Sequence, residues 1–272
     1  MNKLTYCILF IILFLISIVS FAQQNKKVLI VMDEKPQMEV LAKFFSAGEN
    51  IITDIVDQEH LPQKFSDYRA VIYYIHGGLS EEAEKAVIDY TKGGGKYICL
   101  HHSISSGKAN NKYYFDFLGI QLDDPEFSPY PVKPGGGYGW LESDAKGINY
   151  MLVNLNPNAF VTNNKIEWGQ PVDYQSSDDL TIKRKYPAIV FKNTEAYFNH
   201  KFTDGREKTV LCGFKFLDPR NNELFMQDRA VWYKPYGKGI IYYFMPGHFA
   251  SDYENKNLAQ MILNAIMYDG KE

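Results

Sequence analysis

The stretch AVIYYIHGGLSEEAEKAVIDYTKGGGKYICLHH, residues 70–102, has the pattern of a strand, a helix and a second strand. Residues 70–76 and 96–102 are mainly apolar runs of strand length. Between them, Ser80 is placed to cap a helix whose first turn is acidic and which ends at a run of glycines. Strands that are apolar throughout and joined by a helix predict a parallel pair, buried on both faces.

The same alternation occupies the chain from residue 26 onward. Residues 26–32 (KKVLIVM) and 50–56 (NIITDIV) are strand-like, and residues 36–48 (PQMEVLAKFFSAG) have helical spacing. The last third returns to strands, with a hairpin around KPYGKG (residues 234–239), and closes in an amphipathic helix over residues 255–268. This pattern predicts an α/β fold of three layers, with a mostly parallel sheet covered by helices on both faces.

One region breaks the pattern. DDPEFSPYPVKPGGGYGW, residues 123–140, holds four prolines and four glycines. We therefore expect a single domain over residues 23–272, with an irregular insertion around 121–165. Residues 135–137 are three glycines, but no strand precedes them and no Gly-Lys-Ser/Thr follows, so a phosphate-binding loop is not supported.

The first 22 residues have the pattern of a secretory signal peptide. Lys3 precedes the apolar run CILFIILFLISIV, and small residues precede a cleavage point near Ala22. The run is short for a membrane span, although an uncleaved anchor is the alternative. We expect an exported protein, periplasmic or extracellular, without stable membrane insertion after cleavage.

Net charge argues against a nucleic-acid partner. The chain has 29 basic and 32 acidic residues, a formal charge of −3, and no basic cluster. A slightly acidic surface repels the phosphate backbone. The expected partner is therefore a small molecule, and the oligomeric state stays open.

The histidines are the most informative feature of the sequence. His76, His101, His102 and His248 fall at the carboxyl ends of predicted strands, and Glu34 follows the first strand. In open parallel sheets, ligands bind in the crevice outside those ends. A single histidine at a strand end is usually a surface residue, but four at one edge indicate a site.

The alternation of side chains along a strand predicts that the two adjacent histidines, His101 and His102, point to opposite faces of the sheet. Neighbouring residues of a strand point to opposite faces, so His101 would share a face with Cys99 while His102 takes the other. Either one imidazole packs under a helix or the chain turns sharply there. We expect His101 to face the crevice.

The cysteines are expected to be structural. A strand that leads into ICLHH is superficially similar to the cysteine elbow of class I glutamine amidotransferases. That elbow needs small residues two positions before and after the nucleophile, where this chain has Tyr97 and His101. We therefore interpret Cys99 as a core residue and expect Cys99 and Cys212 to be buried thiols, with a disulfide between them as the alternative that export allows.

With GGGKYICLHHSI and VWYKPYGKGIIYYFMPGH both in view, the chain resembles the ThuA-like (trehalose utilisation) family. That family shows a strand ending Gly-Leu-His-His, and near the C-terminus Gly-Lys-Gly-Arg, an apolar strand and Gly-His. Two departures are Cys99 in place of a glycine and Ile240 in place of the arginine. The matching positions are Leu100, His101, His102, Gly237, Lys238, Gly239, Gly247 and His248.

The resemblance covers roughly residues 26–268 and implies a flavodoxin-like fold, related to the class I glutamine amidotransferases but without their cysteine. It is weaker in the middle of the chain. Family members carry an acidic Asp-Glu-x-Tyr segment there, and residues 166–174 (IEWGQPVDY) match it poorly. The family is associated with the metabolism of oxidised, or keto, sugars.

Together, the residues and the resemblance predict an exported protein that acts on or binds a carbohydrate or keto-sugar, by lyase, hydrolase or isomerase chemistry. Imidazole suits acid–base catalysis or binding of a divalent metal, and Glu34 or Asp252 could complete a metal site, although the sequence has no metal-ligand spacing such as His-Glu-x-x-His and no cofactor is certain. The alternative is a sugar-binding or accessory protein without catalysis. The expected catalytic residues are His101, His248 and His102, and the expected substrate-binding residues are His76, Glu34, Trp140 and Asp252.

Overall fold

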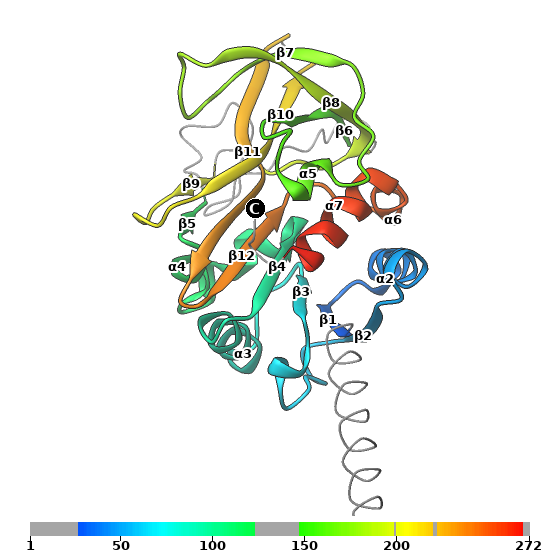
Figure 1. Ribbon diagram of the computed structural model, residues 1–272. Coiled ribbons are helices and arrows are strands. Elements are labelled where there is room, and N and C mark those ends of the chain that lie inside the picture. Colours follow the sequence, from blue (N-terminus) through cyan, green and yellow to red (C-terminus); the bar gives the residue numbers. More distant parts are fainter. Residues whose placement is uncertain (1–26, 123–146, 199, 220–221, 269–272) are drawn as a thin grey trace, which may run out of the picture.

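A ten-stranded sheet of order β2-β1-β3-β4-β12-β11-β10-β6-β8-β7 runs through the protein (Figure 1). The computed structural model describes residues 27–122, 147–198, 200–219 and 222–268. The strands of this sheet are β1 (Lys27–Met32), β2 (Ile52–Val56), β3 (Ala70–Tyr74), β4 (Lys96–Leu100), β6 (Ile148–Asn154), β7 (Pro171–Gln175), β8 (Lys183–Thr194), β10 (Thr209–Leu217), β11 (Leu224–Tyr236) and β12 (Gly239–Phe244). A separate pair joins β5 (Ile120–Gln121) to β9 (Lys201–Phe202).

Half of the sheet is parallel. Strands β2, β1, β3, β4 and β12 run in one direction, with β1 between β2 and β3. Helix α2 (Lys35–Glu49) connects β1 to β2, and helix α3 (Glu81–Lys92) connects β3 to β4. These crossovers leave the centre of the sheet in opposite directions, so right-handed connections place α2 and α3 on opposite faces. The predicted three-layer α/β fold is confirmed (Figure 1). From the neighbouring strands β1 and β3, the two crossover connections run toward opposite edges of the sheet.

The remaining strands extend the sheet in antiparallel fashion. β11 and β12 form the hairpin predicted around residues 234–239, and β10, β6, β8 and β7 follow in that spatial order. The lower part of Figure 1 shows the parallel half, and the upper part shows the twisted antiparallel half. The site described below lies where these halves meet.

The insertion expected around 121–165 is only partly irregular. Residues 148–154 form β6, an interior strand of the sheet, and α5 (Phe160–Asn163) adds a short helical turn. The prediction was wrong for this segment because β6 is recruited by pairing with β8 and β10, which are distant in sequence. Residues 123–146, with Trp140 and the glycines at 135–137, lie outside the described residues.

Most local predictions along the rest of the chain are confirmed. The side chain of Ser80 caps α3 by accepting a hydrogen bond from the backbone N–H of Ala83. The helix predicted over residues 255–268 is α7 (Lys256–Met267), α6 (Ala250–Tyr253) precedes it, and α4 (Tyr114–Leu118) is a short helix between β4 and β5. Cys99 and Cys212 are buried free thiols, and burial raises the pKa of Cys99 to about 11.

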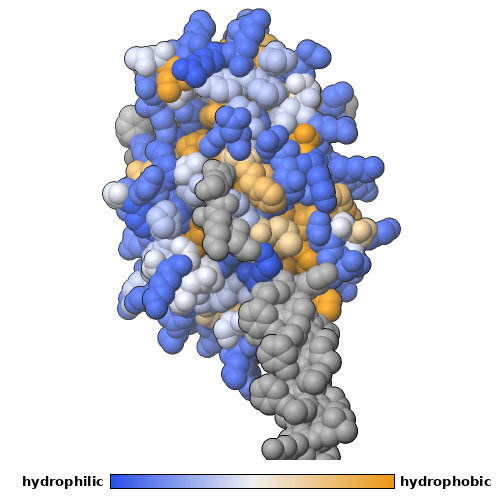
Figure 2. Space-filling model, in the orientation of Figure 1, coloured by the Kyte–Doolittle hydropathy of each residue, from blue (hydrophilic) through white to orange (hydrophobic). Residues whose placement is uncertain are grey.

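The surface and the N-terminal segment complete the description. Figure 2 shows a mostly hydrophilic face, with apolar residues gathered in a limited area near its middle. Among the described residues, no helix is both long enough and apolar enough to cross a membrane. The predicted signal peptide, residues 1–22, lies outside the described part of the chain.

Candidate functional site

The histidines predicted at one edge of the sheet do meet there. His76 follows β3, His101 and His102 follow β4, and His248 follows β12, while Glu34 follows β1. These four strands are parallel, so their carboxyl ends share one edge. One ring nitrogen from each of His101, His102 and His248 lies within 4.8 Å of the others.

The chain turns sharply at His101. Strand β4 ends at Leu100, and residues His101–Ile104 form a single 3-10 turn. His101 has a φ of 46°, in the left-handed region that residues other than glycine seldom adopt. The turn brings the rings of His101 and His102 together, with centroids 5.2 Å apart. Of the two alternatives that alternation left open, the sharp turn is the one observed.

His101 is buried and makes three polar contacts. Its Nδ1 lies 2.7 Å from the carbonyl oxygen of Met245. Its Nε2 lies 3.0 Å from Oε2 of Glu195 and 3.1 Å from Nδ1 of His248. A carbonyl oxygen can only accept, so Nδ1 of His101 carries a proton. The ring is thereby oriented with Nε2 toward Glu195 and His248.

Glu195 is an ionised carboxylate in a buried position. It directly follows β8, and its Oε2 also lies 3.1 Å from Nδ1 of His248. Burial alone would raise the pKa of Glu195, but hydrogen bonds from His101 and His248 outweigh it and lower the pKa to about 2. Burial would conversely lower the pKa of His248, yet the neighbouring Glu195 raises it. The pair favours a negative Glu195 beside a protonated His248.

His102 is a neutral ring packed behind this pair. Burial and the neighbouring His101 hold its pKa far below the ordinary value. Its ring lies 4.2 Å from that of Tyr74 and 5.0 Å from that of His76, between centroids. Within the described part of the chain, neither of its ring nitrogens has a hydrogen-bond partner. A buried polar group without a partner costs stability and needs a functional or structural reason.

Two of the predicted substrate-binding residues form an exposed rim above the buried rings. His76 is exposed, and Glu34 is exposed at the start of α2. The amide nitrogen of Gln37 lies 2.6 Å from Oε2 of Glu34 and 3.4 Å from the carbonyl oxygen of His248. His248 is itself half-buried, so the cluster is reached from solvent on the side of this rim.

Asp252 is placed differently from the expectation. Its carboxylate is buried, and Oδ2 accepts hydrogen bonds from the backbone N–H of Phe249 and the hydroxyl of Thr194. The bond from Phe249 closes the turn that follows His248, and the bond from Thr194 connects this turn to the end of β8, next to Glu195. Asp252 therefore stands as a positioning residue rather than as an open ligand. Trp140 lies outside the described residues.

Lys108 supports the loops from below. Its Nζ donates to the carbonyl oxygens of Ile75, His76 and His102 and to the hydroxyl of Ser105. It is buried, and burial lowers its pKa to about 7. This lysine ties the ends of β3 and β4 together, which the sequence reading did not anticipate.

Glu195 was also missed from the sequence, although two signals point to it. It follows a predicted strand, as Glu34 does, and residues 195–197 (Glu-Ala-Tyr) carry the Glu-x-Tyr part of the family segment that was sought at 166–174. The ring of Tyr197 packs against His101, with centroids 5.1 Å apart. Residues 194–197 (Thr-Glu-Ala-Tyr) differ from the Asp-Glu-x-Tyr pattern only by Thr194 in place of the aspartate.

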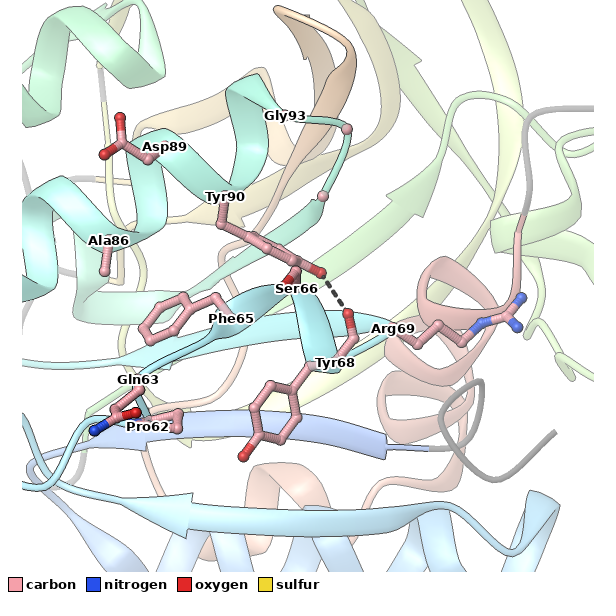
Figure 3. A pocket seen from close by; sticks show the side chains of 12 residues that line it. Pro62, Gln63, Phe65, Ser66, Tyr68, Arg69, Ala86, Asp89, Tyr90 and Gly93 are labelled. Carbon is pink, nitrogen blue, oxygen red and sulfur yellow. Dashed lines mark hydrogen bonds between the residues drawn. The ribbon is translucent and has the colours of Figure 1, made fainter. Parts of the chain in front are cut away.

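A separate cavity lies at the opposite edge of the sheet. It has a volume of about 570 Å³ and is lined near the amino ends of β3 and β4 by Arg69 and residues 93–95. Figure 3 shows Tyr90 crossing it, with its hydroxyl bonded to the carbonyl oxygen of Tyr68 at 3.1 Å. The guanidinium of Arg69 donates to the carbonyl oxygen of Ile266. This cavity holds none of the clustered histidines.

Comparisons with known proteins agree with this fold. The profile of a family described as ThuA, trehalose utilisation, matches residues 24–269. A ThuA-like protein from Bacteroides uniformis ATCC 8492 has a similar structure, with a TM-score of 0.53, 16% identity and 89% of each chain covered. No curated protein matches the sequence significantly.

Two β-galactosidases match more weakly. Those from Bacillus circulans sp. alkalophilus and Rahnella sp. R3 have TM-scores of 0.46 and 0.47, at 12% and 14% identity. The matches cover 89% and 87% of this chain but only 30% and 31% of theirs.

Proposed function

The chain belongs to the ThuA, or trehalose utilisation, family, and we propose that it acts on a carbohydrate or keto-sugar at the cluster of His101, His248 and Glu195. The observation that carries the proposal is the mutual contact of these three side chains at the carboxyl edge of the sheet. Ligands of open α/β sheets bind at this edge.

His248 is the acid–base group of this proposal. It is half-buried, it faces the solvent side of the cluster, and Glu195 raises its pKa from a value that is already near neutrality. In its protonated form this histidine can give a proton to a leaving oxygen, and in its neutral form it can take one from a carbon next to a ketone. His101 orients it through the 3.1 Å contact.

The exposed rim contributes the first contacts with the sugar. His76 and Glu34 offer an exposed imidazole and an exposed carboxylate at this rim. Sugar hydroxyls can donate hydrogen bonds to such groups and accept them from an imidazole N–H. The buried rings lie below, so a sugar that contacts the rim would direct one carbon or one glycosidic oxygen toward His248. Lyase, hydrolase and isomerase chemistry on sugars can each use such a proton transfer.

The test is a search for turnover with matched histidine variants. We would incubate the purified protein with a panel of glycosides and their keto derivatives and follow each by NMR. At least one compound is expected to be consumed, and His248→Gln should slow that reaction by about 10²–10⁴-fold. His60→Gln is the control, because His60 is an exposed ring that pairs with Asp57 away from the cluster.

Other outcomes separate the alternatives. A sugar that raises the melting temperature without being consumed would identify a sugar-binding or accessory protein. If no compound in the panel is consumed or stabilises the protein, the carbohydrate proposal fails.

We also propose that residues 1–22 direct export. The support is the charged start, the apolar run and the small residues before Gln23. The intact mass of the protein recovered from its native cell envelope should correspond to a chain that begins near residue 23. A full-length chain found in the cytoplasmic fraction would contradict export.

A further inference from the structure

Three nitrogen and oxygen atoms that could each bind a metal ion form a small triangle at the centre of the cluster. Nε2 of His101, Nδ1 of His248 and Oε2 of Glu195 are separated by 3.0, 3.1 and 3.1 Å. Ligand atoms about 2.0–2.1 Å from one metal ion lie about 2.9 Å apart in octahedral and about 3.3 Å apart in tetrahedral geometry. The observed separations fall between these two values.

Hydrogen bonding fixes the orientation of one member of this triangle. Nδ1 of His101 lies 2.7 Å from the carbonyl oxygen of Met245, which can only accept, so Nδ1 carries a proton and Nε2 is turned toward Glu195 and His248. Nε2 of His101, Nδ1 of His248 and Oε2 of Glu195 therefore face one another.

A cation is favoured by what surrounds the triangle. His101 is fully buried, and His102 adds a second buried imidazole whose nitrogens have no partner among the described residues. A metal ion would use the lone pairs directly, and one ring nitrogen of His102 is within 4.8 Å of those of the other two histidines.

From this geometry we infer that His101, His248 and Glu195 form a binding site for one divalent transition-metal ion, with zinc as the first candidate. Two imidazoles and one carboxylate are the donor set of several catalytic zinc and iron(II) sites, whereas magnesium and calcium prefer oxygen donors alone. The bond from Nδ1 of His101 to Met245 orients the ring as outer-shell partners of metal-bound histidines do.

The inference rests on the site of the proposed function and assigns its histidines a second role. With a metal bound, His101 and His248 serve as ligands, so the proton transfer proposed for His248 applies to the metal-free protein. Metal binding is measured without any sugar, so the two proposals can fail separately.

The first experiment measures metal retention. Untagged wild-type protein is stripped with a chelator, loaded with Zn²⁺, desalted and examined by elemental analysis. One zinc per chain is expected, together with a rise in melting temperature on adding Zn²⁺. Substituted Co²⁺ should give the visible absorption of an inner-sphere site with nitrogen ligands. Wild-type protein that retains no metal would overturn the inference.

The second experiment locates the site. Glu195→Gln and His248→Ala should each weaken zinc binding by at least about tenfold, while circular dichroism confirms that they are folded. His60→Ala, which removes an exposed histidine, should bind zinc as the wild type does. Zinc retained equally by all three variants would place the metal elsewhere and overturn the assignment.

The combined outcomes keep the two proposals apart. Stoichiometric zinc without sugar turnover would support the metal site and count against the enzymatic proposal. Sugar turnover that persists in metal-free protein would support the acid–base proposal and would show that the reaction does not require a metal.

Discussion

Nε2 of His101 lies 3.0 Å from Oε2 of Glu195, although 94 positions separate the two residues in the chain. His101 belongs to the end of β4 in the parallel half of the sheet, and Glu195 follows β8 in the antiparallel half. Neither half contains the cluster alone. The candidate site therefore depends on how the two halves are joined through β12, β11, β10 and β6.

Glu195→Gln should destabilise the protein. The amide keeps the shape of the side chain but loses the charge that accepts from His101 and His248, and buried charge-assisted contacts contribute about 1–3 kcal/mol. Urea unfolding in the presence of a chelator measures this loss without any metal contribution. Glu34→Gln, at an exposed position, should change the free energy of unfolding by less than about 0.5 kcal/mol. Equal stabilities for the two variants would contradict the role given to Glu195.

Lys108→Met should change how stability depends on pH. Burial lowers the pKa of Lys108 from 10.5 to about 7, while Cys99 and Asp33 act in the opposite direction. Between pH 7 and 10.5 the unfolded chain therefore binds more protons at this residue than the folded chain, so the free energy of unfolding rises with pH.

The measurement is the difference between wild type and Lys108→Met. The variant leaves the carbonyl oxygens of Ile75, His76 and His102 without this donor, so it should be less stable at every pH. The difference should also widen from pH 7 to pH 9, by up to about 1.4 kcal/mol per pH unit. A constant difference across this range would show that Lys108 stays charged in the folded protein.

Gly247→Ala should disturb the backbone that carries His248. Gly247 has a φ of 127°, which side chains rarely allow, and an added Cβ would collide with the hydroxyl of Tyr253. Such strain costs about 1–3 kcal/mol. The melting temperature should fall, and zinc binding or turnover should fall with it.

Gly205→Ala provides the comparison for that prediction. A Cβ at Gly205 would meet nothing within 4 Å, so this variant should be close to neutral. If Gly247→Ala were as stable as Gly205→Ala, the left-handed turn before His248 would not be needed.

His102→Phe should separate stability from function. The phenyl ring can occupy the place of the imidazole against Tyr74, and it removes two buried nitrogens that have no partner in the described part of the chain. The free energy of unfolding should change by less than about 1 kcal/mol. Turnover of the sugar should nevertheless fall, because a polar group retained without a partner inside a core has a use there. Full activity in a folded His102→Phe protein would show that His102 contributes only to packing and has no role in turnover.

Much of the parallel half could be predicted because its signals are local. The apolar runs of β1, β3 and β4, the cap at Ser80 and the glycines after α3 act over a few residues each. The carboxyl ends of parallel strands lie at one edge of the sheet. The order of strands and helices along the chain was therefore sufficient to predict that the histidines lie at that edge.

Other parts could not be predicted, because they depend on contacts between distant segments. β6 was expected to be irregular, and it becomes a strand only through pairing with β8 and β10. Asp252 was expected to face a ligand, and its hydrogen bond from Thr194 instead closes a turn.

By itself, the sequence determined the strands and helices of the parallel half and the edge of the sheet at which the histidines lie, because hydrophobic periodicity and capping are properties of short segments. Tertiary structure alone decided that the chain turns at His101, that Glu195 approaches from the antiparallel half, and that the buried ring nitrogens of His102 have no hydrogen-bond partner among the described residues. These features arise where the packing of distant strands overrides local preference. The left-handed conformation of His101 is held by contacts that Met245 and Glu195 supply, and no pattern within residues 93–107 contains them.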